Sequence, residues 1–221
     1  MEAWGQTRKR NAISAAVTFA VATLNAVTCR GVQLSEDVDS DTPRTAREIA
    51  RRSIALHCAI AAAHGVSKDD ITEWLKEEQL WNEVTPREMT FISEDLNDDK
   101  EIVWMTWLVE AQVALLWSIG KLDELPPASA KCDTGIVVGA MPGLFEPTAP
   151  FIASATLRSA KDIEREEEII YDVHCRVDQA VRKGKRIPRG YDKDVVFFRH
   201  YGLSWVSGYC GQSWDEVTPD T

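Results

Sequence analysis

Two long segments of the sequence are apolar on nearly every side, and they restrict the fold more than any other feature. One is DDKEIVWMTWLVEAQVALLWSIG at residues 98–120, and the other is YDKDVVFFRHYGLSWVSGYCG at residues 191–211. A helix with so little polar surface is stable in water only when other elements surround it. We therefore expect both segments to form the central helices of one hydrophobic core.

Helix-start signals place further helices around these two. In each signal a serine or threonine precedes an acidic residue by three positions, as in Thr45/Glu48, Ser67/Asp70 and Thr85/Glu88. This spacing is typical of N-caps and capping boxes. Residues 157–184 add a helix with one apolar face, formed by Ile163, Ile170, Val173, Val177 and Val181. The predicted fold class is all-α, a single-domain orthogonal multi-helix bundle over residues 1–221.

Two regions interrupt the helical pattern. Residues 121–157 are rich in proline and show no sustained period, so we expect a partly helical excursion that runs over the surface. Residues 212–221, QSWDEVTPDT, form an acidic tail whose tryptophan is expected to anchor the chain end against the body. We assign possible binding of a basic ligand to four residues in and near this tail: Tyr201, Trp214, Asp215 and Asp220.

The N-terminal residues resemble a signal peptide, because Arg8, Lys9 and Arg10 precede the apolar run AISAAVTFAVATLNAV. Apolar residues nevertheless recur in this run at helical spacing, and polar residues interrupt it. We therefore expect an amphipathic first helix, with a cleavable leader as the alternative. The run is too short and too polar to span a membrane.

The charge balance limits the partners of the chain. Its 221 residues include 35 acidic and 25 basic side chains, for a formal net charge of -10. This negative field repels phosphate backbones, so we expect no nucleic-acid partner and consider a basic protein surface the better match. The five cysteines are widely spaced and lack a C-x-x-C pair, which is typical of reduced thiols in the cytoplasm.

Few ionisable groups lie inside the two apolar segments, and these are the candidates for chemistry. Glu110 shares a helical stripe with apolar residues, where a lone buried carboxylate would cost several kcal/mol. Burying Arg199 and His200 without polar partners in the second segment would be costly for the same reason. We therefore expect a buried ion pair between Glu110 and Arg199, with His200 nearby. His174 and Asp178 lie four residues apart on one helix, where an imidazole and a carboxylate can meet.

These five residues admit two interpretations that the sequence leaves open. The ion pair can be a strut that fixes how the two central helices cross. Alternatively, all five groups can converge on a pocket as a catalytic site, in which the His-Asp pair orients a general base or binds a metal. The chain lacks the H-E-x-x-H, G-x-x-x-x-G-K-[ST], G-x-G-x-x-G and G-x-S-x-G fingerprints, so we expect no cofactor and assign no metal site.

The C-terminal third also resembles a known family. Its most specific motifs are a helix with a tyrosine and a histidine, an F-R-H-Y segment followed by a tryptophan, and a W-D-x-V-x-x-D-T end; the residues are Tyr171, His174, Arg199, His200, Tyr201, Trp205, Trp214, Asp215, Val217, Asp220 and Thr221. Further similar segments lie at residues 44–52, 85–88 and 110–120. On these motifs nearly the whole chain resembles the bacterial family called domain of unknown function 4272, from which it departs at residues 126–150 and in the alanine-rich N-terminal helix. The resemblance implies a helical fold and brings no activity, substrate or cofactor.

Three functional hypotheses remain. The leading one is a cytoplasmic bacterial protein that binds a basic protein partner, as an acidic module of an immunity or regulatory type. The alternative is a hydrolase or metal-assisted enzyme built from the five buried groups. The third is a purely structural subunit of an oligomer, which would require a large exposed apolar patch.

Overall fold

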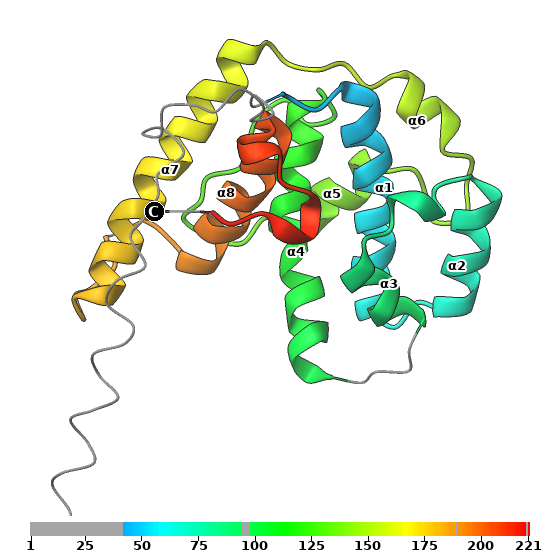
Figure 1. The fold of residues 1–221 in the computed structure, drawn as a ribbon, viewed down its shortest axis with the longest axis horizontal. Helices are drawn as coiled ribbons and strands as arrows, with labels where there is room; N and C mark the ends of the chain where they lie inside the picture. The colour runs from blue at the N-terminus through cyan, green and yellow to red at the C-terminus, as the bar shows by residue number, and fades with distance from the viewer. Residues whose placement is uncertain (1–41, 94–97, 189, 220) are drawn as a thin grey trace, which may run out of the picture. The chain divides into compact units, whose positions relative to one another are not determined.

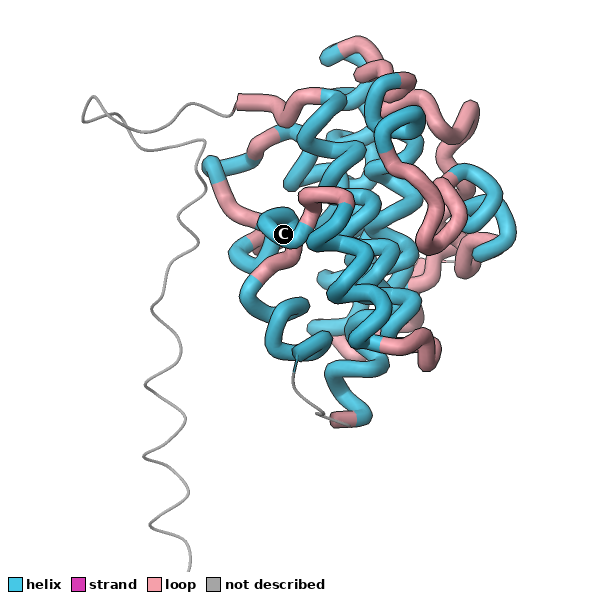
Figure 2. Tube along the Cα trace, turned by 90° about the vertical axis from the view of Figure 1, so that its right-hand side faces the viewer, coloured by secondary structure: helices cyan, strands magenta, loops and turns pink. Residues whose placement is uncertain are grey.

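The computed structural model describes residues 42–93, 98–188, 190–219 and 221. Within them the chain forms eight α-helices and three short 3-10 helices, without any β-strand (Figures 1 and 2). The α-helices are α1 (Ala46–Ala63), α2 (Lys68–Glu77), α3 (Pro86–Ser93), α4 (Asp99–Ser118), α5 (Thr134–Ala140), α6 (Ala149–Ala153), α7 (Ala160–Arg182) and α8 (Lys193–Ser207). The 3-10 helices are η1 (Trp81–Glu83), η2 (Tyr209–Gly211) and η3 (Trp214–Glu216).

The predicted all-α class is therefore confirmed for the described part of the chain. The expected amphipathic first helix lies outside the described residues. The assignment of residues 1–221 to a single domain stays a prediction.

The two apolar helices occupy the centre, as expected. Among the described elements, α7 packs on α8, α8 packs on α4, and α4 packs on α1 (Figure 1). The side chains in the middle of α4 and α8 are excluded from water: Met105, Leu108, Ala111, Val113, Leu115, Leu116, Val196, Leu203 and Val206 are at most 1% exposed. Burying this apolar surface is the main favourable contribution to folding.

The crossing of α4 and α8 depends on small residues. Gly202 of α8 faces Ala111 and Ala114 of α4, and a Cβ atom on Gly202 would lie 2.8 Å from the Ala111 carbonyl oxygen. It would also lie 3.1 Å from the Ala114 Cβ atom. Because these distances are shorter than ordinary van der Waals contacts, glycine is required for this spacing of the helices. The close crossing brings the few polar side chains of the two helices within reach of each other.

The helix starts follow the predicted caps. The Thr45 hydroxyl accepts a hydrogen bond from the Glu48 backbone N–H, and the Glu48 carboxylate accepts one from the Thr45 N–H, which completes a capping box at α1. The Ser67 hydroxyl accepts from the Asp70 N–H at the start of α2. Such caps satisfy backbone donors that a helix leaves unpaired, and each contributes about 1 kcal/mol.

The excursion at residues 121–157 is partly helical, as expected, but it is not confined to the surface. Val137 of α5 and Phe151 of α6 are buried in the core. The Glu78 carboxylate, just after α2, accepts hydrogen bonds from the backbone N–H and the hydroxyl of Thr148. Sequence periodicity did not predict this packing, because single anchor residues in short helices leave no repeat.

The apolar stripe predicted for α7 is correct except at its end. Its first four members are buried against the fold: Ile163, Ile170, Val173 and Val177. Val181, in contrast, is 50% exposed. Among the described residues, the end of α7 is exposed together with residues 183–186, which follow it.

The tight crossing predicts the effect of one methyl group. Gly202→Ala should destabilise the protein by about 2 kcal/mol, because the added Cβ atom overpacks the interface with Ala111. Urea unfolding followed by tryptophan fluorescence measures this loss. The matched control is Gly139→Ala in α5, whose added Cβ atom would meet nothing within 4 Å. Equal unfolding free energies for the two variants would contradict the proposed role of Gly202.

Candidate functional site

Glu110 of α4 and Arg199 of α8 form the predicted buried ion pair. Their side chains are 1% and 0% exposed. Arg199 Nε and Nη2 donate to Glu110 Oε2 at 3.1 and 2.8 Å. The pair also holds the excursion, because Glu110 Oε1 accepts from the Cys132 backbone N–H at 2.8 Å and Arg199 Nη1 donates to the Pro126 carbonyl at 2.6 Å. The arrangement thus joins α4, α8 and residues 126–132.

The observed contacts leave this ion pair without a group that could bind a ligand. Both carboxylate oxygens of Glu110 and all three nitrogens of the Arg199 guanidinium have hydrogen-bonding partners within the protein. The neighbouring Cys132 thiol is not a nucleophile, because burial, with the nearby Glu110 charge, raises its pKa to about 12. The geometry therefore fits the interpretation of a strut.

His174 of α7 and His200 of α8 form a second buried polar contact. Their Nδ1 atoms lie 2.9 Å apart, and the rings meet edge to face. One ring must donate and the other accept, so the contact requires at least one neutral imidazole. Burial lowers the pKa of His200 to about 3, with a further contribution from His174, and burial also lowers the pKa of His174. The α7–α8 interface thus contains two histidines that are held neutral.

The expected contact between His174 and Asp178 is replaced by other partners. Asp178 Oδ2 lies 2.5 Å from Arg182 Nε and accepts from the Thr221 hydroxyl at 3.3 Å. His174 turns instead toward α8. The negative charge of Asp178 only partly offsets the lowering of the His174 pKa by burial. The sequence left open that His174 and Asp178 could meet, and in the structure each has another hydrogen-bonding partner. Spacing along a helix does not determine which neighbour a tertiary contact provides.

Trp214 anchors the C-terminal tail, as predicted. It is 4% exposed, and its ring meets those of Tyr201 and Trp205 at centroid distances of 5.1 and 5.4 Å. The Tyr201 hydroxyl donates to the Trp214 carbonyl, and Asp215 Oδ2 accepts from the Arg87 backbone N–H at 3.0 Å. The sequence-assigned Asp220 lies outside the described residues. A binding role for these tail residues stays a prediction.

Sequence reasoning missed a second buried ion pair. Arg52 of α1 and Glu88 of α3 are 3% and 2% exposed and are joined by a salt bridge. The Arg52 guanidinium also lies 4.7 Å from the centre of the Trp214 ring and donates to the Glu83 carbonyl. A signal was present, since Arg52 lies three residues after the buried Ile49 and so falls near the apolar face of α1.

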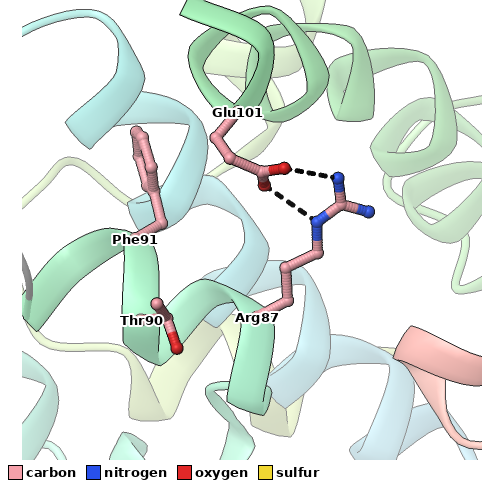
Figure 3. A pocket seen from close by; sticks show the side chains of 4 residues that line it. All are labelled: Arg87, Thr90, Phe91 and Glu101. Carbon is pink, nitrogen blue, oxygen red and sulfur yellow. Dashed lines mark hydrogen bonds and ion pairs between the residues drawn. The ribbon is translucent and has the colours of Figure 1, made fainter. Parts of the chain in front are cut away.

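A small pocket of about 180 Å³ lies between α3 and the start of α4 (Figure 3). Arg87, Thr90, Phe91 and Glu101 line it. Arg87 donates to both carboxylate oxygens of Glu101, at 2.9 and 3.0 Å. Because the two charges already satisfy each other, this pocket offers a ligand little beyond its apolar wall.

A larger cleft of about 380 Å³ lies where the end of α4 meets the start of α7. Its lining combines four carboxylates with two guanidinium groups and two apolar side chains: Asp123, Glu124, Asp162, Glu166, Arg158, Arg165, Trp117 and Leu125. Arg158 is occupied by the protein backbone, since it donates to the carbonyls of Trp117, Leu122 and Asp123 at 2.7 to 2.8 Å. We call this feature the acidic cleft.

None of the five catalytic candidates lines either of these two pockets. Glu110 and Arg199 form one cluster, His174 and His200 form another, and Asp178 pairs with Arg182. The described residues contain no group of three or more His, Cys, Asp or Glu side chains arranged to hold a metal ion. In the same part of the chain, no helix combines the length and the apolar character needed to cross a bilayer.

These features define a class of all-helical proteins with two central apolar helices joined by a buried ion pair. The family model described as a domain of unknown function, DUF4272, matches residues 22–217 of the 221-residue chain. The chain therefore belongs to the DUF4272 family. No curated protein and no solved structure matches it.

The strut interpretation predicts an asymmetric response to mutation. Glu110→Gln should destabilise the protein by about 3 to 5 kcal/mol, because it leaves the Arg199 charge buried without a counter-charge. The double variant Glu110→Met with Arg199→Met should be less destabilised, since it removes both charges together. Urea unfolding measures both. A double variant that loses more stability than Glu110→Gln would contradict this account.

The histidine pair predicts a loss of stability on acidification. An unfolded histidine binds a proton near its ordinary pKa of about 6.5, whereas the folded state holds His200 neutral to much lower pH. Stability is therefore complete above about pH 6.5 and falls as the pH is lowered. For His200 alone the loss between about pH 7.5 and about pH 5.5 is about 1.4 kcal/mol.

The measurement is urea unfolding at these two pH values for the wild type and for the double variant His174→Phe with His200→Phe. The double variant should depend less on pH. The pKa of His57 is also lowered by burial, but His57 is present in both proteins and its contribution cancels. A pH dependence unchanged by the double substitution would show that the pair does not titrate as described.

Proposed function

We propose that this chain is a protein-binding module, of an immunity or regulatory type, whose acidic cleft receives a basic segment of a partner protein in the cytoplasm. The observation that supports the proposal most is the lining of the cleft, in which four carboxylates face two guanidinium groups. The net charge of -10 adds a long-range attraction for a basic partner. Electrostatic complementarity of this kind mainly accelerates association and selects the partner.

The charges in the cleft are incompletely paired. Arg165 lies 3.6 Å from Asp162 and 3.4 Å from Glu166, so one exposed guanidinium is shared loosely between two carboxylates. Asp123 and Glu124 are exposed, and no hydrogen bond or ion pair engages their carboxylates within the described residues. Lysine or arginine side chains of a partner can therefore pair with Asp123 and Glu124 without first breaking an internal contact.

The rival hypothesis of a hydrolase or metal-assisted enzyme requires Glu110, His174, Asp178, Arg199 and His200 to share one pocket. In the structure these residues form separate clusters with their own partners. The contacts therefore favour the binding hypothesis over this particular catalytic site.

The test is direct binding of a basic probe. A fluorescein-labelled peptide of alternating arginine and glycine should bind the full chain with an affinity that falls steeply as salt is added. Asp123→Lys with Glu124→Lys should weaken binding by about tenfold, because two carboxylates of the cleft are replaced by like charges. Fluorescence anisotropy at about 0.05 M and about 0.3 M salt measures both effects.

The matched control is Glu73→Lys with Glu77→Lys on the exposed side of α2, which changes the net charge by the same amount away from the cleft. This control should lose much less affinity. Equal losses in the two variants would mean that the peptide responds only to overall charge, and the proposal would then be abandoned.

A further inference from the structure

The charges along α7 are separated by sign. Acidic side chains dominate residues 162–172: Asp162, Glu164, Glu166, Glu167, Glu168 and Asp172. Basic side chains dominate its end and the loop that follows: Arg176, Arg182, Lys183, Lys185 and Arg186. The separation suits the dipole of α7 itself, which favours anions at its start and cations at its end. It also places five basic side chains within residues 176–186 of a protein whose net charge is -10.

The basic end is largely unused within the protein. Lys183, Lys185 and Arg186 are exposed, and no salt bridge engages them in the described residues. We call these three residues the basic loop. The acidic cleft lies at the opposite end of α7, where Asp162 and Glu166 form part of its lining. At a rise of about 1.5 Å per residue, the helix separates Asp162 in the cleft from Lys183 in the basic loop by about 30 Å.

One stripe of α7 connects these two ends along the border of its exposed side. Its members recur at helical spacing: Asp162, Glu166, Ile169, Asp172, Arg176 and Lys183. Ile169, Asp172, Arg176 and Lys183 are exposed, whereas Asp162 and Glu166 are half-buried beside the packed face of the helix. Ile169, near the middle of the stripe, is 49% exposed. Along the stripe, acidic side chains lie at positions 162, 166 and 172, on both sides of Ile169, and basic side chains follow at 176 and 183. Asp172 and Arg176 lie 3.7 Å apart.

We propose that this stripe is an interface for a second copy of the chain, with the two α7 helices antiparallel and the basic loop of each copy seated on the acidic cleft of the other. A two-fold axis near the middle of α7 makes both contacts at once, and it places the two Ile169 side chains near each other at the centre. A parallel arrangement would oppose like charges. The charge pattern of α7 thus favours a second copy of the chain as the partner and an antiparallel arrangement of the two helices.

The dimer is weak and sensitive to salt, because its contacts are mostly exposed ion pairs with a small apolar centre. The net charge of -10 on each copy opposes association at long range, but salt screens this repulsion beyond about 8 Å at physiological ionic strength. The complementary charges lie much closer together than that at the interface. The inference rests on the proposed function in one respect, since both use the acidic cleft.

A charge swap between two variants tests the interface. The loop variant has Lys183→Glu, Lys185→Glu and Arg186→Glu, and the cleft variant has Asp123→Lys and Glu124→Lys. Each variant alone opposes like charges at the interface, so each should sediment as a monomer where the wild type forms a dimer. An equal mixture should form a heterodimer, because the unaltered loop meets the unaltered cleft and the reversed loop meets the reversed cleft.

Sedimentation velocity at about 0.05 M salt measures the oligomeric state, and far-ultraviolet circular dichroism verifies that each variant is folded. Glu73→Lys with Glu77→Lys is the control, and it should still dimerise. If reversing the loop charges prevents folding, Lys183→Ser, Lys185→Ser and Arg186→Ser replaces that variant and should give the monomer. A monomeric wild type, a dimer that survives either charge reversal, or a mixture that stays monomeric would each overturn the proposal.

The loop variant also separates this inference from the proposed function. Its acidic cleft is unaltered, so it should bind the arginine–glycine peptide at least as well as the wild type does. Failure of dimerisation together with retained peptide binding would remove the second copy as a partner and leave the acidic cleft as a binding site. Loss of cleft-dependent peptide binding would remove the proposed function as well.

Discussion

The ion pair between Glu110 and Arg199 is the interaction on which the arrangement of the described residues depends. It lies where α4 and α8 cross closely, and its remaining hydrogen-bonding groups hold the backbone at Pro126 and Cys132. Two charges removed from water are stable only when each is neutralised and hydrogen-bonded, so the pair requires both helices and the excursion to be in place. One contact thus couples three segments that lie far apart in the sequence.

The sequence predicted this pair because a charge in an otherwise apolar helix has few possible partners. Glu110 and Arg199 were each improbable in their segments, and neutralising each other was the simplest solution. The caps at Thr45 and Ser67 were predictable for a different reason, since they depend only on residues within one helical turn. A single sequence therefore predicts contacts within one helical turn and contacts that a buried charge requires.

Other contacts between helices were not predictable, because more than one partner was available to the side chains that make them. His174 had a polar neighbour available on its own helix, yet it contacts His200 across the α7–α8 interface. Arg52 falls near the apolar face of α1, but nothing local to that helix identified Glu88 of α3 as its partner. The acidic cleft combines residues 117–125 with residues 158–166, so it exists only after the chain has folded.

The strut and the acidic cleft are parts of one arrangement. Asp123 and Glu124 lie on a short segment that is held on both sides: Arg158 binds the carbonyls of Leu122 and Asp123, and Arg199 binds the carbonyl of Pro126. A segment fixed in this way loses little conformational entropy when a ligand arrives, and binding is stronger for that reason. If the cleft binds a partner as proposed, the buried pair contributes indirectly, because it fixes the backbone next to Asp123 and Glu124.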